Sequence, residues 1–196
     1  MLDIYIAKLP TDYSEEAVYP PERQKIIENT KNKDVRRERY FVWRLLERAV
    51  MQSLGKTLED ISPYINNNGK WLSDKCYFSL SHTDCAVAVA VSDSPVGIDI
   101  EAYRKIDIDA FGERILSSNE RAELENESDK NGFIIELWTK KESIYKMNGT
   151  PPFVPSKIET KDYQTLTYHE WINDKKCCVS VCSSSISDAK ITKIIL

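Results

Sequence analysis

The chain has 196 residues, of which 41% are hydrophobic and 30% charged, with a formal net charge of -4 and a pI near 5.4. This composition is typical of a globular protein with a sizeable core, and it excludes an intrinsically disordered chain. The net negative charge argues against a general binder of nucleic acid or of an anionic membrane surface. The first residues lack a basic segment followed by a long apolar one, and no apolar run is long enough to span a bilayer, so we expect a cytosolic protein.

The charge is unevenly distributed along the chain. Residues 20–49 carry nine Lys or Arg against five Asp or Glu, whereas residues 99–130 carry five against ten. An anionic ligand bound together with a cation would suit this polarity. The five cysteines are an odd number without repeated Cys-x-x-Cys pairs, and there are only two histidines. Reduced, mostly buried thiols are therefore expected rather than a zinc site or disulfides.

The first third of the chain predicts a strand and a long helix. Apolar and polar residues alternate over 2–7, which predicts an opening strand ended by Pro10. A polar, basic region follows, and Asp34 is expected to cap a helix with Gly55 just past its end. Arginines in the first turns of this helix oppose its dipole, so something beyond helix stability could require them, although solvated surface charge explains any single one equally well. The basic residues of interest are Arg23, Lys25, Arg36, Arg37 and Arg39.

Two further strands are predicted on either side of a short polar segment. An Asn-rich turn ends at Gly69 and is followed by Lys70, without the flanking residues of a Walker loop. Residues 76–80 and 86–91 then read as strands that flank Ser81 and His82. A histidine at the end of a strand can contact an anion or cap a turn, and its position alone favours the turn.

Residues 96–101, V-G-I-D-I-E, read as a strand with one acidic face. Side chains alternate along a strand, so the two isoleucines point to one side, and Asp99 and Glu101 to the other. Their Cα atoms would lie about 6.6 Å apart, close enough for both carboxylates to bind one hard cation. The pattern alone favours the simpler interpretation, a half-buried strand with acidic residues in water.

The second half predicts two helices and further strands. A capping box at residues 117–120 begins a helix that continues to about 127, and Asn131-Gly132 is expected to break it. The pattern is helical again over 133–147, with Asn148-Gly149 as the stop. Strand-like runs follow around 177–182 and 191–195.

The helix predicted over 133–147 carries three residues at intervals of four. Trp138, Glu142 and Lys146 therefore share one face. A surface ion pair contributing about 0.2–0.5 kcal/mol is the simpler explanation when the helix is considered alone.

Several segments together resemble the signatures of the 4′-phosphopantetheinyl transferases. The family has V-G-I-D-I-E, followed some forty residues later by W-[ST]-x-K-E-[SA]-x-x-K, and this chain has W-T-K-K-E-S-I-Y-K at residues 138–146. The segment R-I-L-S-S-N-E at 114–120 is similar to the family's R-x-F-S-x-x-E. Upstream, Gly69-Lys70 and F-S-L-S-H-T at 78–83 extend the resemblance to the longer, Sfp-type enzymes.

This resemblance implies an α/β (α+β) fold of two similar subdomains related by a pseudo-twofold axis, with coenzyme A in the cleft between them. We expect an N-terminal subdomain over residues 1–92, on the adenylate side of coenzyme A, and a C-terminal subdomain over residues 93–196 with the metal site and the catalytic helix. The implied reaction transfers the phosphopantetheine arm of coenzyme A to a serine of an apo acyl, peptidyl or aryl carrier protein and releases adenosine 3′,5′-bisphosphate. A monomer is expected, because the two halves can build the cleft that three short subunits build in trimeric relatives.

The resemblance also implies roles for individual residues. The carboxylates of Asp99, Glu101 and Glu142 match the family's ligands for Mg²⁺, and Mn²⁺ would suit the same oxygens. Glu142, or a water that it holds, is the expected base, and Lys146 would neutralise or protonate the departing phosphate. The remaining residues expected to hold coenzyme A through its phosphates are Lys70, Ser81, His82, Lys141, Arg23, Lys25 and Arg37. Gly97, without a side chain on the acidic face, could let the cofactor approach the strand.

Three departures from the family pattern and two alternative functions are relevant. Trp71 stands where the family often has a proline, and Leu80 and Thr83 replace the commoner isoleucine and serine. A catalytically silent coenzyme A or carrier-protein binding module would have lost a carboxylate or a lysine, and none is lost here. A divalent-metal phosphohydrolase would share the carboxylates but not the spacing of the lysines around Glu142.

Overall fold

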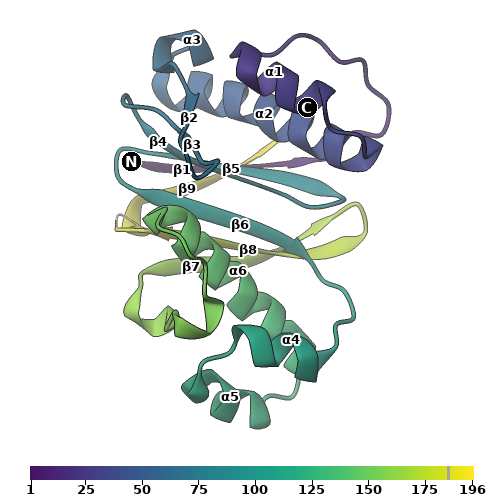
Figure 1. The fold of residues 1–196 in the computed structure, drawn as a ribbon, viewed down its shortest axis with the longest axis vertical. Coiled ribbons are helices and arrows are strands. Elements are labelled where there is room, and N and C mark those ends of the chain that lie inside the picture. The colour runs from purple at the N-terminus through teal and green to yellow at the C-terminus, as the bar shows by residue number, and fades with distance from the viewer. Residues whose placement is uncertain (185) are drawn as a thin grey trace.

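The structure is a computed structural model that describes residues 1–184 and 186–196, and it shows a mixed α/β protein (Figure 1). The helices are α1 (Pro21–Glu28), α2 (Lys33–Leu54), α3 (Leu58–Ile61), α4 (Ile108–Ile115), α5 (Ser118–Glu125) and α6 (Lys130–Asn148). The strands are β1 (Leu2–Lys8), β2 (Tyr64–Ile65), β3 (Trp71–Leu72), β4 (Tyr77–His82), β5 (Ala86–Ser92), β6 (Val96–Ala102), β7 (Thr165–Ile172), β8 (Lys175–Ser183) and β9 (Ala189–Ile194).

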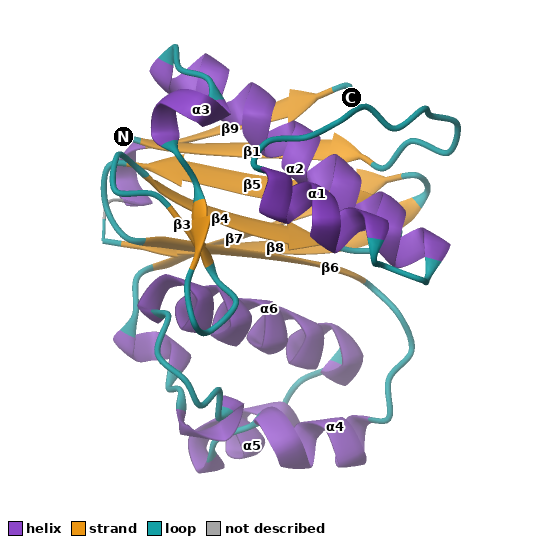
Figure 2. Ribbon diagram, turned by 45° about the horizontal axis from the view of Figure 1, so that its top comes forward, coloured by secondary structure: helices purple, strands orange, loops and turns teal. Residues whose placement is uncertain are grey.

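Two sheets pack face to face and form the inner layers of the molecule. The first has the strand order β4-β5-β1-β9 and the second β6-β8-β7, while β2 and β3 form a separate short ribbon. Helix α2 covers the outer face of the first sheet and α6 covers the outer face of the second (Figures 1 and 2). The apolar side of β6 faces β1 and β5, so the isoleucines of the V-G-I-D-I-E segment lie in the core between the sheets.

Helix α2 is the hydrophobic support of the first sheet. Its apolar residues recur at helical spacing, and eight residues between Tyr40 and Val50 are buried against the sheet. Gly55 ends the helix in the left-handed conformation, with φ 63°, as the sequence predicts. The predicted N-cap is wrong, because the Asn32 side chain accepts hydrogen bonds from the backbone N–H groups of Asp34 and Val35.

Helix α6 supports the second sheet and begins earlier than the sequence predicts. The predicted break at Asn131-Gly132 lies inside its first turn, because Asp129 caps the helix by accepting a hydrogen bond from the Gly132 N–H. The predicted stop at Gly149 is confirmed, with φ 67°. The capping box of α5 is also confirmed, because Ser117 and Glu120 exchange side-chain to backbone hydrogen bonds.

The chain passes from the first sheet to the second between β5 and β6, next to Ser92. The chain later returns to the first sheet, because β9 pairs in parallel with β1 (Figure 2). The first sheet is therefore built from both ends of the described chain.

Two expectations from composition can be compared with the structure. All five cysteines are buried and free, as predicted. No helix among residues 1–184 and 186–196 has the length and apolar character needed to cross a membrane.

Candidate active site

The acidic face of β6 lies under helix α6. Asp99 and Glu101 point toward this helix, where they contact Lys146 and Trp138. Gly97 lies on the same face, and a β-carbon there would come within 1.9 Å of the Ser143 carbonyl oxygen. The prediction that Gly97 lets a cofactor approach the strand is therefore wrong, because the backbone of α6 fills that space.

Asp99 has a buried carboxylate whose two oxygens differ in their hydrogen bonding. Its Oδ1 accepts hydrogen bonds from Ser81 Oγ and Lys146 Nζ, each at 2.7 Å. Its Oδ2 is buried and has no hydrogen-bond partner among the described residues. An unpartnered oxygen on a buried carboxylate is costly, so Oδ2 is the atom of this side chain that is left for a ligand.

Glu142 and Lys146 lie on the same face of α6, as their spacing predicts, with Lys146 Nζ 4.0 Å from Glu142 Oε2. Burial, together with the negative charges of Asp99 and Glu101 and against the opposing charge of Lys146, raises the pKa of Glu142 to about 7. Glu101 accepts hydrogen bonds from Trp138 Nε1 at 3.1 Å and from Arg104 at 2.5 Å.

The three predicted metal carboxylates are neighbours, but they do not form an assembled metal site. Within the described ranges, 1–184 and 186–196, no group of three His, Cys, Asp or Glu side chains is arranged to hold a metal ion. Lys146 and Arg104 instead neutralise Asp99 and Glu101. The residues nevertheless fit a hard divalent cation, because every donor is a carboxylate oxygen and Asp99 Oδ2 is buried with no hydrogen-bond partner in the described part of the chain.

The Ser81 hydroxyl is hydrogen-bonded to Asp99 and does not project into the pocket. Its Oγ donates to Asp99 Oδ1 at 2.7 Å and accepts from the Ile100 N–H and from Lys146 Nζ, both at 3.2 Å. A serine hydroxyl has one hydrogen and two acceptor lone pairs, so these contacts use its full capacity. The prediction that this hydroxyl holds the adenosine bisphosphate is therefore wrong for this arrangement.

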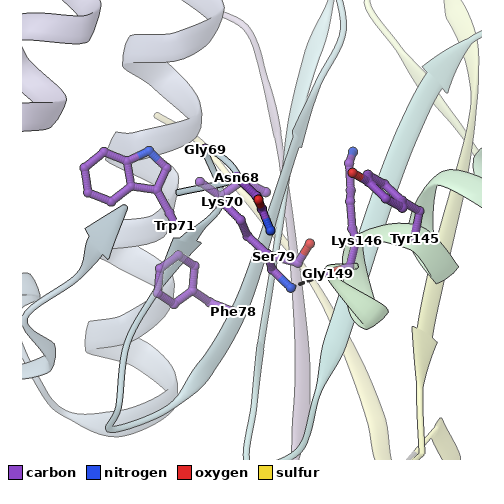
Figure 3. A pocket seen from close by; sticks show the side chains of 10 residues that line it. Asn68, Gly69, Lys70, Trp71, Phe78, Ser79, Tyr145, Lys146 and Gly149 are labelled. Carbon is purple, nitrogen blue, oxygen red and sulfur yellow. Dashed lines mark hydrogen bonds between the residues drawn. The ribbon is translucent and has the colours of Figure 1, made fainter. Parts of the chain in front are cut away.

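Lys70 directly precedes β3, and its side chain reaches the C-terminal end of α6. Its Nζ donates to the Lys146 carbonyl oxygen at 2.5 Å, and burial lowers its pKa (Figure 3). Both lysines line a pocket of about 280 Å³ whose apolar wall includes Trp71, Phe78 and Tyr145 (Figure 3). Trp71, which stands in place of the family's proline, also packs against Trp43 with ring centroids 4.7 Å apart.

His82 lies in a cluster of basic side chains. Burial and the positive charges of Lys146, Arg23 and Arg39 together lower its pKa to about 4. The ring is therefore neutral at pH 7, and the 2.8 Å contact between its Nδ1 and Glu38 is a hydrogen bond and not an ion pair. We call Arg23, Arg39, His82 and Lys146 the basic cluster.

Arg23 is the most deeply buried member of the basic cluster, with 6% of its surface exposed. It donates to the Arg39 carbonyl oxygen and lies over the Trp43 ring, and its Nε has no partner among the described residues. Burial and the charge of Arg39 lower the pKa of Arg23 to about 10. Positive charges held this closely together favour a bound anion.

The other two basic residues expected at the coenzyme, Arg37 and Lys25, differ in their surroundings. Arg37 lies on α2, 3.5 Å from Asp34, with its buried Nε unpartnered among the described residues. Lys25 is exposed on α1. The structure thus gives Arg37 an open donor but gives no sign that Lys25 belongs to the site.

Lys141 does not lie in the cleft. It is fully buried, it pairs with Glu120 at 2.6 Å, and it donates to the carbonyl oxygens of Pro155 and Ile158. These three contacts use all three ammonium hydrogens. The prediction that Lys141 contacts the coenzyme phosphates is wrong, because adjacent helix residues point about 100° apart and Lys141 turns away from Glu142.

Sequence reasoning gave no role in this site to three residues that the structure places there. Arg39 belongs to the basic cluster, although the sequence only marked it as a charge opposed to the helix dipole. Trp138 and Arg104 both hydrogen-bond to Glu101. The shared face of Trp138 and Glu142 was the available signal for the tryptophan.

Comparison with known proteins identifies the family. Residues 95–183 match the 4′-phosphopantetheinyl transferase superfamily. The chain is 31% identical to the 4′-phosphopantetheinyl transferase Gsp of Aneurinibacillus migulanus over 168 residues, which are 76% of this chain and 70% of that protein. It is 32% identical to the 4′-phosphopantetheinyl transferase Psf-1 of Bacillus pumilus over 110 residues, 54% of this chain and 47% of that protein. A crystal structure of holo-[acyl-carrier-protein] synthase from Thermotoga maritima shares 18% identity and aligns with a TM-score of 0.31, covering 45% of this chain and 62% of that chain. The match of residues 95–183 to the family and the similarity to Gsp show that the chain belongs to the 4′-phosphopantetheinyl transferase superfamily.

Proposed function

We propose that this protein transfers the 4′-phosphopantetheine arm of coenzyme A to a serine hydroxyl of an apo carrier protein and releases adenosine 3′,5′-bisphosphate. The observation that carries the proposal is the position of Lys146, which contacts the carboxylates of β6 and α6 and belongs to the basic cluster. One site thus combines groups for a divalent cation with groups for a polyanion. A substrate with a pyrophosphate needs both, because charge develops on its oxygens during displacement at phosphorus.

In the proposed reaction, the serine oxygen forms a bond to the β-phosphorus, and the bond from that phosphorus to the bridging oxygen breaks. Glu142, directly or through a water, accepts the serine proton, and Lys146 stabilises or protonates the departing phosphate. The residues that would hold the cation are Asp99, Glu101 and Glu142. Mg²⁺ or Mn²⁺ bound there would supply positive charge to the pyrophosphate oxygens.

The coenzyme would occupy the boundary between the two halves. Arg23, Arg39 and His82 would hold its bisphosphate end from the first half, and Lys70 would approach from the same side. Each half consists of a sheet covered by one long helix, which supports the proposal of two similar subdomains with a pseudo-twofold relation. Because both walls come from one chain, we propose that the protein acts as a monomer.

One experiment tests the function directly. The protein is incubated with Mg²⁺, coenzyme A and a panel of apo acyl and peptidyl carriers, and the mass of each carrier is measured. A mass increase equal to one phosphopantetheine on at least one carrier is expected. Unchanged carriers across the panel would overturn the proposal, and release of free phosphate would indicate a phosphohydrolase instead.

A further inference from the structure

We infer that Ser81 is a positioning residue that acts through Asp99, and that its hydroxyl does not contact coenzyme A. The inference rests on the proposed function and names what orients the first carboxylate of the acidic strand. Its basis is the difference between Ser81 and Ser79, which occupy equivalent positions on the same strand.

Ser79 and Ser81 both join β4 to β6 through side-chain to backbone hydrogen bonds. Ser79 Oγ accepts from the Ile98 N–H at 3.0 Å, and Ser81 Oγ accepts from the Ile100 N–H at 3.2 Å. Both serines are 5% exposed. Only Ser81 also donates to Asp99, so this contact distinguishes the two residues.

The contact with Ser81 fixes which oxygen of Asp99 is left for a ligand. Oδ1 already accepts from Ser81 and Lys146, so rotating the carboxylate by half a turn would break both bonds. Oδ2 is thereby held in a buried position without a partner among the described residues. Groups that orient a metal-binding carboxylate in this way typically change metal affinity by about 10–100-fold when they are removed.

Of the two donors on Oδ1, only Ser81 has no other proposed task. Lys146 is the group that would stabilise the departing phosphate, so its bond to Asp99 weakens when it serves the substrate. The Ser81 hydroxyl is anchored by the Ile100 N–H and can hold Oδ1 throughout. A neutral donor also leaves the negative charge of Asp99 available to a cation.

The first test measures binding of Mn²⁺ alone by electron paramagnetic resonance. Ser81→Ala should weaken Mn²⁺ binding by about 10–100-fold. Ser79→Ala is the matched control, because it removes the equivalent bond to β6 but leaves Asp99 untouched, and its Mn²⁺ affinity should stay close to that of the unmodified protein. Equal affinities in the two variants, or no Mn²⁺ binding by the unmodified protein, would overturn the inference.

The second test separates positioning from phosphate contact. Binding of adenosine 3′,5′-bisphosphate is measured by calorimetry with EDTA present, so that no metal contributes. Ser81→Ala should bind as the unmodified protein does. A clear loss of affinity in this variant would return Ser81 to the phosphate site and overturn the inference.

Folding of each variant is checked by circular dichroism and urea unfolding. If Ser81→Ala does not fold, Ser81→Cys replaces it, because a thiol has nearly the same size but is a weak donor. This variant should also lose Mn²⁺ affinity, and unchanged affinity would overturn the inference. Failure of the unmodified protein to modify any carrier would overturn the proposed function, whereas carrier modification with equal Mn²⁺ affinities in the two serine variants would overturn only the role of Ser81.

Discussion

Gly97 and Ser143 bring β6 and α6 into backbone contact, because a β-carbon on the glycine would lie 1.9 Å from the Ser143 carbonyl oxygen. This close approach places Glu142 and Lys146, on either side of Ser143 in the helix, above the carboxylates of the strand. The glycine thus sets the spacing of the candidate site, although it contributes no functional group to it.

Gly97→Ala should therefore both destabilise the protein and disturb the site. The new methyl group meets backbone that cannot move aside alone, so we expect a loss of about 3 kcal/mol or more in the free energy of unfolding, at or above the upper end for overpacking. Urea unfolding measures this loss. Gly112→Ala is the control, because its β-carbon would meet side-chain methyl groups of Leu116 at 3.3 Å and Ile134 at 3.7 Å and would lie in a helix, where alanine is favoured by about 1 kcal/mol. Similar stabilities of the two variants would contradict the packing argument.

Lys141→Met should destabilise the protein strongly, because it leaves the buried Glu120 carboxylate without its cation. Breaking a buried pair in this way costs about 3–5 kcal/mol. The neighbouring Lys140→Met removes a partly exposed pair with Glu136 and should cost only about 0.3–0.5 kcal/mol. Chemical unfolding of both variants gives the comparison.

The affinity of folded Lys141→Met for adenosine 3′,5′-bisphosphate should be unchanged, because all three ammonium hydrogens serve Glu120 and the two carbonyl groups. Weaker binding in a sample shown to be folded would restore Lys141 to the phosphate site.

Arg39→Ala should weaken binding of adenosine 3′,5′-bisphosphate. A hydrogen bond to a charged group contributes roughly 1.5–3 kcal/mol, which corresponds to about a 10–150-fold loss of affinity. Lys25→Ala also removes one positive charge from the first half, but from an exposed site on α1, and should leave the affinity nearly unchanged. Calorimetry at two salt concentrations tests both variants. Equal losses would show that the net charge of the region matters more than the basic cluster.

His82 should titrate far below an ordinary histidine. The chain has two histidines, so proton NMR with a His169→Gln variant assigns each resonance. We expect the His82 resonance to report a pKa of about 4. A value near the usual 6.5 would mean that the ring is neither desolvated nor close to the cations of the basic cluster.

The same shift predicts the pH dependence of stability. The unfolded chain binds a proton at this histidine near pH 6.5, whereas the folded protein does so only near pH 4. Between these values the unfolded state holds more protons, so the free energy of unfolding falls as the pH is lowered through this window. His82→Gln should show a shallower fall over the same window, measured by urea unfolding at several pH values.

Local signals in the sequence predicted much of the fold. The capping box at Ser117, the left-handed glycines at 55 and 149 and the alternation along β6 depend on neighbouring residues, and the structure confirms them. The sequence missed α1, because Pro20-Pro21 suggests a loop, although proline is well suited to the first turn of a helix. It also missed α4 and β7, whose packing partners are distant in the chain.

The residues of the site were predicted unevenly, for a physical reason. Glu142 and Lys146 share a helix face, so their spacing located them correctly. The roles of Lys141, Ser81 and Gly97 depended on what occupies the space beside each residue, and the sequence pattern contains no such information. Lys141 and Ser81 are hydrogen-bonded by neighbouring parts of the fold, and the space beside Gly97 is filled by the backbone of α6.

The return of β9 to the first sheet places both chain crossings between the two sheets at the same end of the molecule. Both covalent crossings between the sheets lie at the end where Ser94 contacts Ser183, 3.3 Å apart. The opposite end is held by non-covalent contacts, including Lys175 with Asp84 and Cys85 with Cys177. The two sheets are therefore joined covalently at one end only, and at the end of β4 that carries His82 they are held together by side-chain contacts alone.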